Sequence, residues 1–507
     1  MRKLVVIGLD GGTFSLLESY LEILPTFKNL YENGYKANLL STLPPISPPA
    51  WASFMTGKNV GKHGVCGFLT STGNPVSSSS IKDKVLWEIL SEKGITVGVV
   101  NVPLTYPPRR VKGFLVSGFL TPPQAREITF PPSLISEISE LKDYRIDVSF
   151  AQKWLFTRSA LRRIDKQKLL REQFEITAQH VAVAKKLLQI YDPLFFIIVF
   201  RGTDTLQHYF WGQERILQSY YRKLDEAIEE ILNCFKDTPN IFILSDHGFG
   251  PIASKIFYVN TWLKQEGFLK LKENIKDRIF RKFFQVTFIL DILERIFKLS
   301  IPLSPKRVGQ VRKKIKSQID EIKSYAYAES VGGLFGIKIL KEEIKDELIR
   351  KLLDLKDEKG QTIIKEVFEK EELYSGPFVK EMPDLLLLQD HKYMFSDFLA
   401  EKVFRPFKTD RSGDHANGFI EGIFIASGPD IKANHKIEEK FHIYDIAPTI
   451  LHMFGLPIPD DMDGRVLTEI FREDSEPARR PVRYIKVSEE RERIKGRIER
   501  LRRERRL

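Results

Sequence analysis

Short apolar runs alternate with longer amphipathic segments along most of the chain. The apolar runs have the length of strands and few charged residues, which is typical of strands buried on both faces of a parallel sheet. This alternation predicts an α/β fold in which helices cover both faces of a mostly parallel sheet. The predicted strands are Leu4–Leu9, Lys36–Leu43, Thr96–Asn101, Leu194–Phe200, Asn240–Leu244 and Gly422–Ala426, and the predicted helices are Asp83–Lys93, Leu161–Tyr191, Tyr220–Lys236 and Tyr444–Met453.

The alternation is interrupted in two regions, and these interruptions divide the chain into predicted units. Residues 102–150 are rich in Pro and Gly, which predicts an irregular insertion over one face of the sheet. The pattern breaks again after residue 254. The predicted units are the first part of the core (1–254), a helical lid (255–330), a small α+β insertion or cap (331–395), the second part of the core (396–472) and a charged basic tail (473–507).

Two segments are candidates for contact with a membrane surface. The segment Ile279–Leu303 is rich in Phe, Ile and Leu but is interrupted by charges, which favours a lid helix packed on the body, with a helix lying on a membrane as the alternative. Residues 479–507 hold thirteen Lys and Arg against five Asp and Glu. This predicts a solvated helix or a disordered tail, able to make weak electrostatic contact with anionic lipid or RNA but without a specific nucleic-acid site.

The composition bears on the size of the core and on the expected cellular location of the protein. The 507 residues are 42% hydrophobic, which is ample for a large core. The two cysteines, Cys66 and Cys234, provide no disulfide framework and no cysteine metal site, so a cytoplasmic location is expected, with peripheral membrane attachment as the alternative. The apolar start is too short for a signal peptide, and no stretch is long and uncharged enough to span a membrane.

One loop places a hydroxyl where a helix is expected to begin. Ser47 is followed by Pro48 and Pro49, which suit the first helical turn, and Gly57 can end the helix. A helix N-terminus offers free N–H groups and the positive end of the helix dipole, so this position predicts an anion site that contains a hydroxyl. The alternative is that Ser47 is only an N-cap residue.

Acidic residues and histidines follow three of the predicted strands. Asp10 follows the first strand, Asp204 and His208 follow the fourth, and a fourth cluster around His415 lies in a loop. Each cluster alone is as well explained by a cap or a turn. Because the ends of parallel strands converge on one crevice, their joint occurrence predicts a site for divalent metal ions with Asp and His ligands. The third strand-end cluster is Asp246 and His247.

Together these motifs resemble the alkaline phosphatase superfamily. The chain is most similar to the type I phosphodiesterase/nucleotide pyrophosphatase branch, and within it to the predicted phosphohydrolase/phosphomutase group of archaea and bacteria. The motifs occur in the order that the family uses. They are Gly8-Leu9-Asp10-Gly11, Pro45-Ile46-Ser47-Pro48, Thr56-Gly57, His63-Gly64, Asp204 with His208, Ser245-Asp246-His247-Gly248, Gly413-Asp414-His415 and Asp460-Asp461-Met462-Asp463-Gly464.

The resemblance implies an alkaline-phosphatase-like core and a two-metal phosphohydrolase. It implies zinc as the expected ion, with manganese or magnesium as alternatives, and a small phosphorylated substrate such as a nucleotide or a lipid head-group diester. It also implies that Ser47 is the nucleophile and forms a phosphoserine intermediate. The ligands implied for one ion are Asp204, His208 and His415, and those implied for the other are Asp10, Asp246, His247 and the oxygen of Ser47.

The sequence departs from the branch at two positions. Nucleotide pyrophosphatases usually have threonine as the nucleophile, where this chain has Ser47. They also have a phosphate-binding asparagine shortly after the His-Gly pair, but the corresponding place here is near Gly67-Phe68. The groups that could replace the asparagine are Lys62, Arg201, Thr203 and backbone N–H groups.

Other functions share part of this pattern. A sulfatase would need arginine at Trp51, and the serine motif of cofactor-independent phosphoglycerate mutases is not visible, although a phosphomutase or phosphomonoesterase stays an alternative. A non-enzymatic protein with a relic site would be expected to lack ligands, and none is missing. A diester substrate is favoured by aromatic residues near the motifs, which could provide an apolar wall. These are Trp51, Phe68, Phe210 and Trp211.

Overall fold

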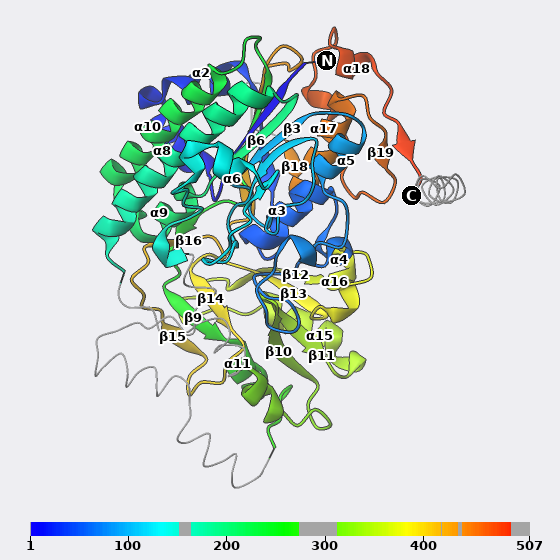
Figure 1. Cartoon of the computed structure of the whole chain (residues 1–507). Helices are drawn as coiled ribbons and strands as arrows, with labels where there is room; N and C mark the ends of the chain where they lie inside the picture. Colours follow the sequence, from blue (N-terminus) through cyan, green and yellow to red (C-terminus); the bar gives the residue numbers. More distant parts are fainter. Residues whose placement is uncertain (1, 152–163, 273–311, 417, 434–438, 488–507) are drawn as a thin grey trace.

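The largest element of the computed structural model is a nine-stranded sheet, which lies in the upper part of the view in Figure 1. Its strands follow the order β18-β2-β17-β7-β1-β6-β3-β4-β5. The structure describes residues 2–151, 164–272, 312–416, 418–433 and 439–487. The strands are β1 (Leu4–Leu9), β2 (Tyr35–Leu40), β3 (Val97–Val100), β4 (Gly113–Val116), β5 (Thr129–Phe130), β6 (Phe195–Phe200), β7 (Asn240–Leu244), β17 (Glu421–Ser427) and β18 (Lys440–His442).

The centre of the sheet is parallel. β1 pairs in parallel with β6 on one side and with β7 on the other, and every residue of these three strands is buried. β17 runs antiparallel between β7 and β2, and β5 is antiparallel at one edge. The predicted α/β class with a mostly parallel sheet is therefore confirmed.

The sequence prediction for residues 102–150 was wrong in one respect. These residues do not form only an irregular insertion, because β4 and β5 extend the sheet beyond β3. The side chains of Phe114, Leu115 and Val116 in β4 are buried, and prolines flank this strand without interrupting it. A short strand of this kind is hidden among the turn residues that surround it.

Helices cover both faces of the sheet (Figure 1). On one face α10 (Glu214–Leu232) packs against α8 (Lys166–Tyr191) and α2 (Pro25–Asn33). On the other face α3 (Ser47–Thr56), α5 (Leu86–Glu92) and α17 (Ile446–Met453) contact one another. The amphipathic segments thus bury their apolar faces against the sheet, as their period predicted.

A second unit lies below the sheet in the view of Figure 1. It contains an antiparallel sheet in the order β10-β11-β13-β12, a three-stranded sheet around β9 (Lys255–Tyr258), and α15 (Lys345–Leu353). The predicted boundary between residues 330 and 331 falls inside the β10–β11 hairpin, and one hydrophobic cluster runs from Phe257 to Phe404. We therefore describe residues 255–272 and 312–406 as one α+β unit. The strands of its larger sheet are β10 (Ala326–Val331), β11 (Leu334–Ile339), β12 (Ile364–Glu369) and β13 (Leu385–Gln389).

The α+β unit touches the loop that leads to Ser47. The Tyr374 hydroxyl donates to the carbonyl of Leu43 at 2.7 Å and accepts from its N–H at 2.9 Å. The turn of the β10–β11 hairpin accepts a hydrogen bond at Gly332 from the N–H of Leu69 at 3.2 Å. The α+β unit therefore contacts both the loop before Ser47 and the segment around Leu69.

Part of the predicted tail is ordered on the core. β20 (Tyr484–Ile485) pairs with β19 (Ile458–Pro459), and the Arg480 guanidinium donates to the carbonyl of His452. Residues 479–487 are thus neither a solvated helix nor disordered, because their backbone and one arginine find partners on the body. The rest of the tail, residues 488–507, lies outside the described residues. The predicted lid helix Ile279–Leu303 also lies outside them.

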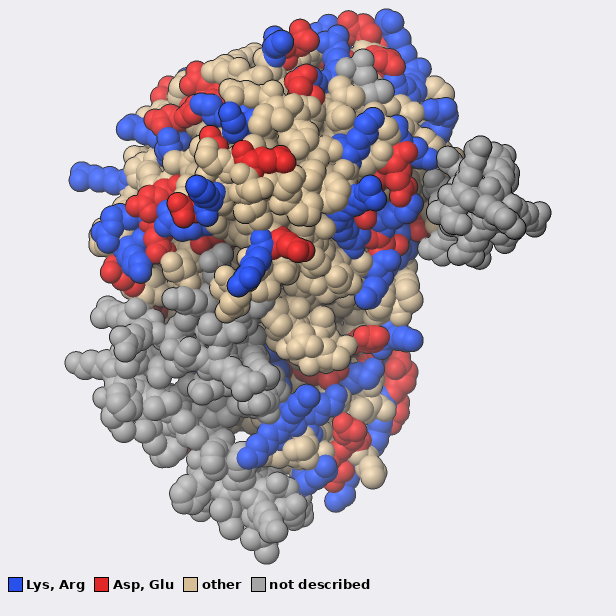
Figure 2. All heavy atoms as spheres, in the orientation of Figure 1, with Lys and Arg blue, Asp and Glu red and all other residues tan. Residues whose placement is uncertain are grey.

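On the face shown in Figure 2, the basic and acidic side chains of the described residues are interspersed. No helix in the described part of the chain is long and apolar enough to cross a membrane.

A candidate two-metal site with a serine

Adjacent strands bring most of the predicted ligands to one edge of the sheet. Asp10 directly follows β1, and Asp246 and His247 follow β7, its neighbour. α9 (Gly202–Phe210) follows β6, the other neighbour, and carries Asp204 and His208 one turn apart, which places both side chains on one face of the helix. The carboxyl ends of three parallel strands therefore converge as the sequence predicted.

His415 reaches the site through a pairing that the sequence did not indicate. β16 (Gly413–Asp414) pairs with β8 (Gly250–Pro251), and β8 lies just after His247. The imidazole of His415 stacks on that of His247, with ring centroids 3.8 Å apart and an interplanar angle of 15°. This contact joins the end of β7 to a segment more than 150 residues further along the chain.

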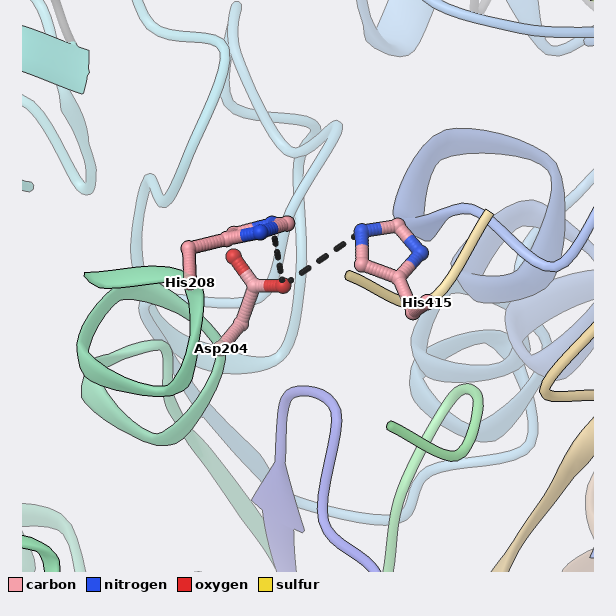
Figure 3. Close-up of side chains that lie close together, drawn as sticks. All are labelled: Asp204, His208 and His415. Atoms are coloured by element: carbon pink, nitrogen blue, oxygen red, sulfur yellow. Dashed lines mark ion pairs between the residues drawn. The ribbon is translucent and has the colours of Figure 1, made fainter. Parts of the chain in front are cut away.

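The first ligand cluster, which we call the Asp204 group, consists of Asp204, His208 and His415 (Figure 3). Oδ1 of Asp204 lies 3.3 Å from Nε2 of His208 and 3.5 Å from Nε2 of His415. The two imidazoles approach the same carboxylate oxygen from different elements. These three side chains are the ligands predicted for one of the ions.

The second cluster, which we call the Asp10 group, consists of Asp10, Ser47, Asp246 and His247. The hydroxyl of Ser47 donates to Oδ1 of Asp10 at 3.2 Å and lies 3.5 Å from Nε2 of His247. The same nitrogen lies 3.6 Å from Oδ1 of Asp10 and 3.3 Å from Oδ2 of Asp246. Asp204 also lies close to Asp10 and His247, with ligand atoms within 4.8 Å of one another, so it stands between the two groups.

Hydrogen bonds orient all three imidazoles in the same way. Nδ1 of His208 lies 3.0 Å from the carbonyl of Gly413, and Nδ1 of His247 lies 3.0 Å from that of Gly248. Nδ1 of His415 lies 2.7 Å from the carbonyl of Pro45. Since a carbonyl only accepts, each Nδ1 carries the proton and each Nε2 presents a lone pair to the site. This is the arrangement of metal-ligating histidines.

The donor atoms fit bound cations. Three carboxylate oxygens are buried without any hydrogen-bond donor: Oδ2 of Asp10, Oδ1 of Asp204 and Oδ2 of Asp246. Burial, together with the charges of neighbouring carboxylates, raises the pKa of Asp10 well above its usual value and raises that of Asp246 to about 7. Burial also lowers the pKa of His415 to about 3 and keeps its imidazole neutral. Neutral imidazoles and carboxylates that need a counter-charge are the ligands that zinc and similar ions take.

Ser47 is held by close packing of α3 on β1. A Cβ at Gly8 in β1 would lie 2.6 Å from the Trp51 ring, so only glycine allows this approach. The N-cap position of α3 is occupied by Ile46, and Ser47 is the first helical residue, with its hydroxyl donating to Asp10, so Ser47 is not the N-cap residue. The N-terminus of α3 has fewer free backbone N–H groups than the sequence analysis predicted. Pro48 and Pro49 have no N–H, and the N–H of Ala50 donates to the carbonyl of Ile46.

The structure shows which of the candidate phosphate-binding residues and predicted aromatic wall residues have partners within the protein. Lys62 forms an ion pair with Asp463, and the hydroxyl of Thr203 donates to the carbonyl of Asp10, so neither side chain is directed at a substrate. Of the four predicted aromatic wall residues, Trp51 and Phe210 are core residues. Phe68 and Trp211 are partly exposed, and Trp211 packs against Phe249, which contacts the rings of His208 and His415.

Comparison with known proteins identifies the class. The sequence matches the family described as type I phosphodiesterase / nucleotide pyrophosphatase over residues 4–415, and the chain belongs to this family within the alkaline phosphatase superfamily. It is therefore a hydrolase that acts on phosphoric ester bonds, and its family is metal-dependent.

A solved structure supports the fold. Human ectonucleotide pyrophosphatase / phosphodiesterase 5 aligns with a TM-score of 0.51 and 13% sequence identity, covering 93% of this chain and 100% of the human chain. The likeness confirms the alkaline-phosphatase-like fold. No curated protein matches the sequence.

Proposed function

We propose that this protein is a two-metal phosphodiesterase or nucleotide pyrophosphatase that forms a phosphoserine intermediate on Ser47. The observation that supports the proposal most is the position of the Ser47 hydroxyl. It lies within hydrogen-bond distance of Asp10 and His247, inside a cluster of carboxylates with unpaired oxygens. A hydroxyl in such surroundings is placed for nucleophilic attack.

Seven side chains would hold the ions. The Asp204 group would bind one ion, and the Asp10 group, including the oxygen of Ser47, would bind the other. We expect zinc because the donors are imidazoles and carboxylates, with manganese or magnesium as alternatives. When bound, the ions supply positive charge that favours an ionised serine and stabilises the charge that develops on the phosphoryl group and the leaving oxygen.

The residues of the chain position the reacting hydroxyl. Asp10 accepts the hydrogen bond of the hydroxyl, so the proton can pass to this carboxylate as the serine oxygen bonds to phosphorus, and the leaving oxygen departs as an anion with the electron pair of the broken bond. The oxygen of a water molecule then bonds to phosphorus, the bond between phosphorus and the Ser47 oxygen breaks, a phosphate monoester is released, and one proton of the water returns to Ser47. The burial of Asp10, Ser47 and His247 keeps bulk solvent away from this centre and strengthens its electrostatic interactions.

A small phosphodiester is the substrate that we propose. The partly exposed Trp211, which packs against the aromatic neighbour of the histidines, is suited to contact the second ester group of a diester. The first test compares bis-p-nitrophenyl phosphate with p-nitrophenyl phosphate on zinc-loaded protein, with Asp246→Ala as the inactive control. A diester preference that is lost in the control supports the proposal. A monoester preference would instead favour a phosphatase or phosphomutase.

The second test concerns the nucleophile. We expect Ser47→Ala to abolish turnover and phosphoserine formation while it largely retains the bound metal, because only the attacking oxygen is removed. Ser79→Ala is the matched control, since Ser79 is exposed and remote from the ligands in the sequence. The measurements are turnover, metal content and mass spectrometry of acid-quenched protein. Near-normal turnover in Ser47→Ala would refute the assignment.

A further inference from the structure

A buried arginine connects the Asp204 group to a distant carboxylate. The side chain of Arg201 is only 10% exposed. Arg201 directly precedes α9, and Asp204 lies in the first turn of this helix. Its Nε donates to Oδ2 of Asp147 at 2.6 Å, and its Nη1 lies 3.3 Å from Oδ2 of Asp204. Its Nη2 donates to the hydroxyl of Thr205 at 3.1 Å. All three guanidinium nitrogens therefore contact protein acceptors.

The two oxygens of the Asp204 carboxylate have different surroundings. Oδ2 faces Arg201, whereas Oδ1 faces Nε2 of His208 and of His415 and has no hydrogen-bond donor. A carboxylate can rotate and present either oxygen unless one of them is held. The contact with Arg201 holds one oxygen and leaves the other for a ligand.

Asp147 in turn holds the arginine. Its side chain is 2% exposed, and its second oxygen accepts a hydrogen bond from the N–H of Val148 at 2.7 Å, so both oxygens have donors. The ring of Phe119 lies 3.8 Å from the guanidinium carbon of Arg201 and covers one face of the group. Arg201 is thus fixed by a carboxylate at one end and by a ring against its plane.

We propose that Arg201 and Asp147 are positioning residues, which hold Asp204 so that only Oδ1 binds metal and thereby set the affinity of the Asp204 group. The inference rests on the proposed metal sites. It assigns Arg201 a role other than the substitute for a phosphate-binding asparagine, because its hydrogen bonds are directed at the protein. Partners that orient a metal ligand in this way typically change metal affinity by about 10–100-fold when they are removed.

The test is a zinc titration of metal-free protein against a chromophoric chelator, which resolves the binding equivalents. We expect Arg201→Gln to weaken one equivalent by about 10–100-fold and to leave the other near its wild-type affinity. Asp147→Asn keeps the shape of the network and removes one charge, so a smaller loss at the same equivalent is expected. Arg145→Gln is the matched control, since Arg145 lies two residues from Asp147 and pairs with Glu175 on the surface.

Two further readouts separate positioning from a loss of folding. The absorption spectrum of cobalt(II)-loaded protein should change in Arg201→Gln at one equivalent only, and Arg201→Lys should restore part of the affinity, because lysine can still contact Asp204. Equal affinities in wild type and in both folded variants Arg201→Gln and Asp147→Asn would overturn the inference. A wild-type protein that binds no zinc would overturn the proposed function with it, so the two failures are distinguishable.

Discussion

The Asp10 group and the Asp204 group lie side by side, but their charges are balanced in opposite ways. Among the described residues, no Lys or Arg forms an ion pair with Asp10 or Asp246, and both side chains are fully buried. Asp204 has Arg201 beside it. Burial and the charges of Asp246 and Asp204 raise the pKa of Asp10. At Asp204 the charge of the Arg201 guanidinium acts against burial and favours the ionised carboxylate.

The two groups therefore differ in whether a cationic side chain of the protein lies beside their carboxylates. In the Asp204 group, one oxygen of the Asp204 carboxylate has the Arg201 guanidinium beside it, and the other oxygen has no hydrogen-bond donor. The Asp10 group holds two buried carboxylates that form no ion pair with a Lys or Arg of the described residues and whose repulsion a bound cation would relieve, and it is the group that contains Ser47. Functional residues often lower the stability of the free protein in this way, because the charge needed for chemistry is uncompensated until the cofactor binds.

The largest expected effect concerns the need for both groups. Asp246→Asn in one group and His415→Gln in the other should each remove one metal equivalent and lower kcat by on the order of 10³-fold, since the charge stabilisation of a metal ion is worth several kcal/mol. The measurements are steady-state turnover of the diester and metal content by elemental analysis. Asp237→Asn, an exposed aspartate before β7, is the control. Near wild-type turnover in either variant would show that one group suffices.

A smaller effect tests directly whether the carboxylate charges of the two groups are balanced differently in the metal-free protein. In chelator-treated protein at mildly alkaline pH, Asp246→Asn should raise the free energy of unfolding by about 1–3 kcal/mol, because it removes one of two buried like charges. Asp204→Asn should lower it by about 1–3 kcal/mol, because Arg201 loses a charged partner. Urea unfolding followed by tryptophan fluorescence measures both. If the two substitutions change stability in the same direction, the comparison between the groups does not hold.

The smallest effect uses a buried histidine outside both groups as a reference for acid sensitivity. Nε2 of His63 lies 3.0 Å from the hydroxyl of Ser53, the N–H of Val65 donates to its Nδ1, and burial lowers its pKa from 6.5 to about 3. Between the unfolded pKa of 6.5 and the folded pKa of about 3, the unfolded chain binds a proton that the folded protein does not bind. The stability that the neutral His63 contributes is therefore fully present above pH 6.5 and is lost as the pH falls through this window. The loss is at most about 1.4 kcal/mol per pH unit.

The corresponding measurement is the stability difference between wild type and His63→Gln as a function of pH. The variant should be less stable near neutral pH, because it alters the contacts with Ser53 and Val65, and the two curves should converge as the pH is lowered. A difference that stays constant with pH would contradict a neutral His63. The acid sensitivity that remains in the variant belongs to other groups, including the two ligand groups.

The sequence was sufficient where a signal is local. The strands β1, β6 and β7 are continuous apolar runs, and the acidic residues that follow them can be placed at one edge because parallel strands end together. The helix after Ser47 was predictable from its two prolines and the glycine at its end. The strand β4 was missed because four residues among prolines carry too weak a pattern.

Long-range packing decided the rest. His415 enters the site only because β16 pairs with β8, and the α+β unit reaches the serine loop only through contacts such as that of Tyr374 with Leu43. Asp147 and Arg201 were unremarkable as a pair in the sequence, since 54 residues separate them and neither belongs to a motif. The sequence by itself therefore determined the class of fold and the types of ligand. Only the tertiary structure decided which oxygen of Asp204 is free, because that depends on buried partners that the chain brings together after it has folded.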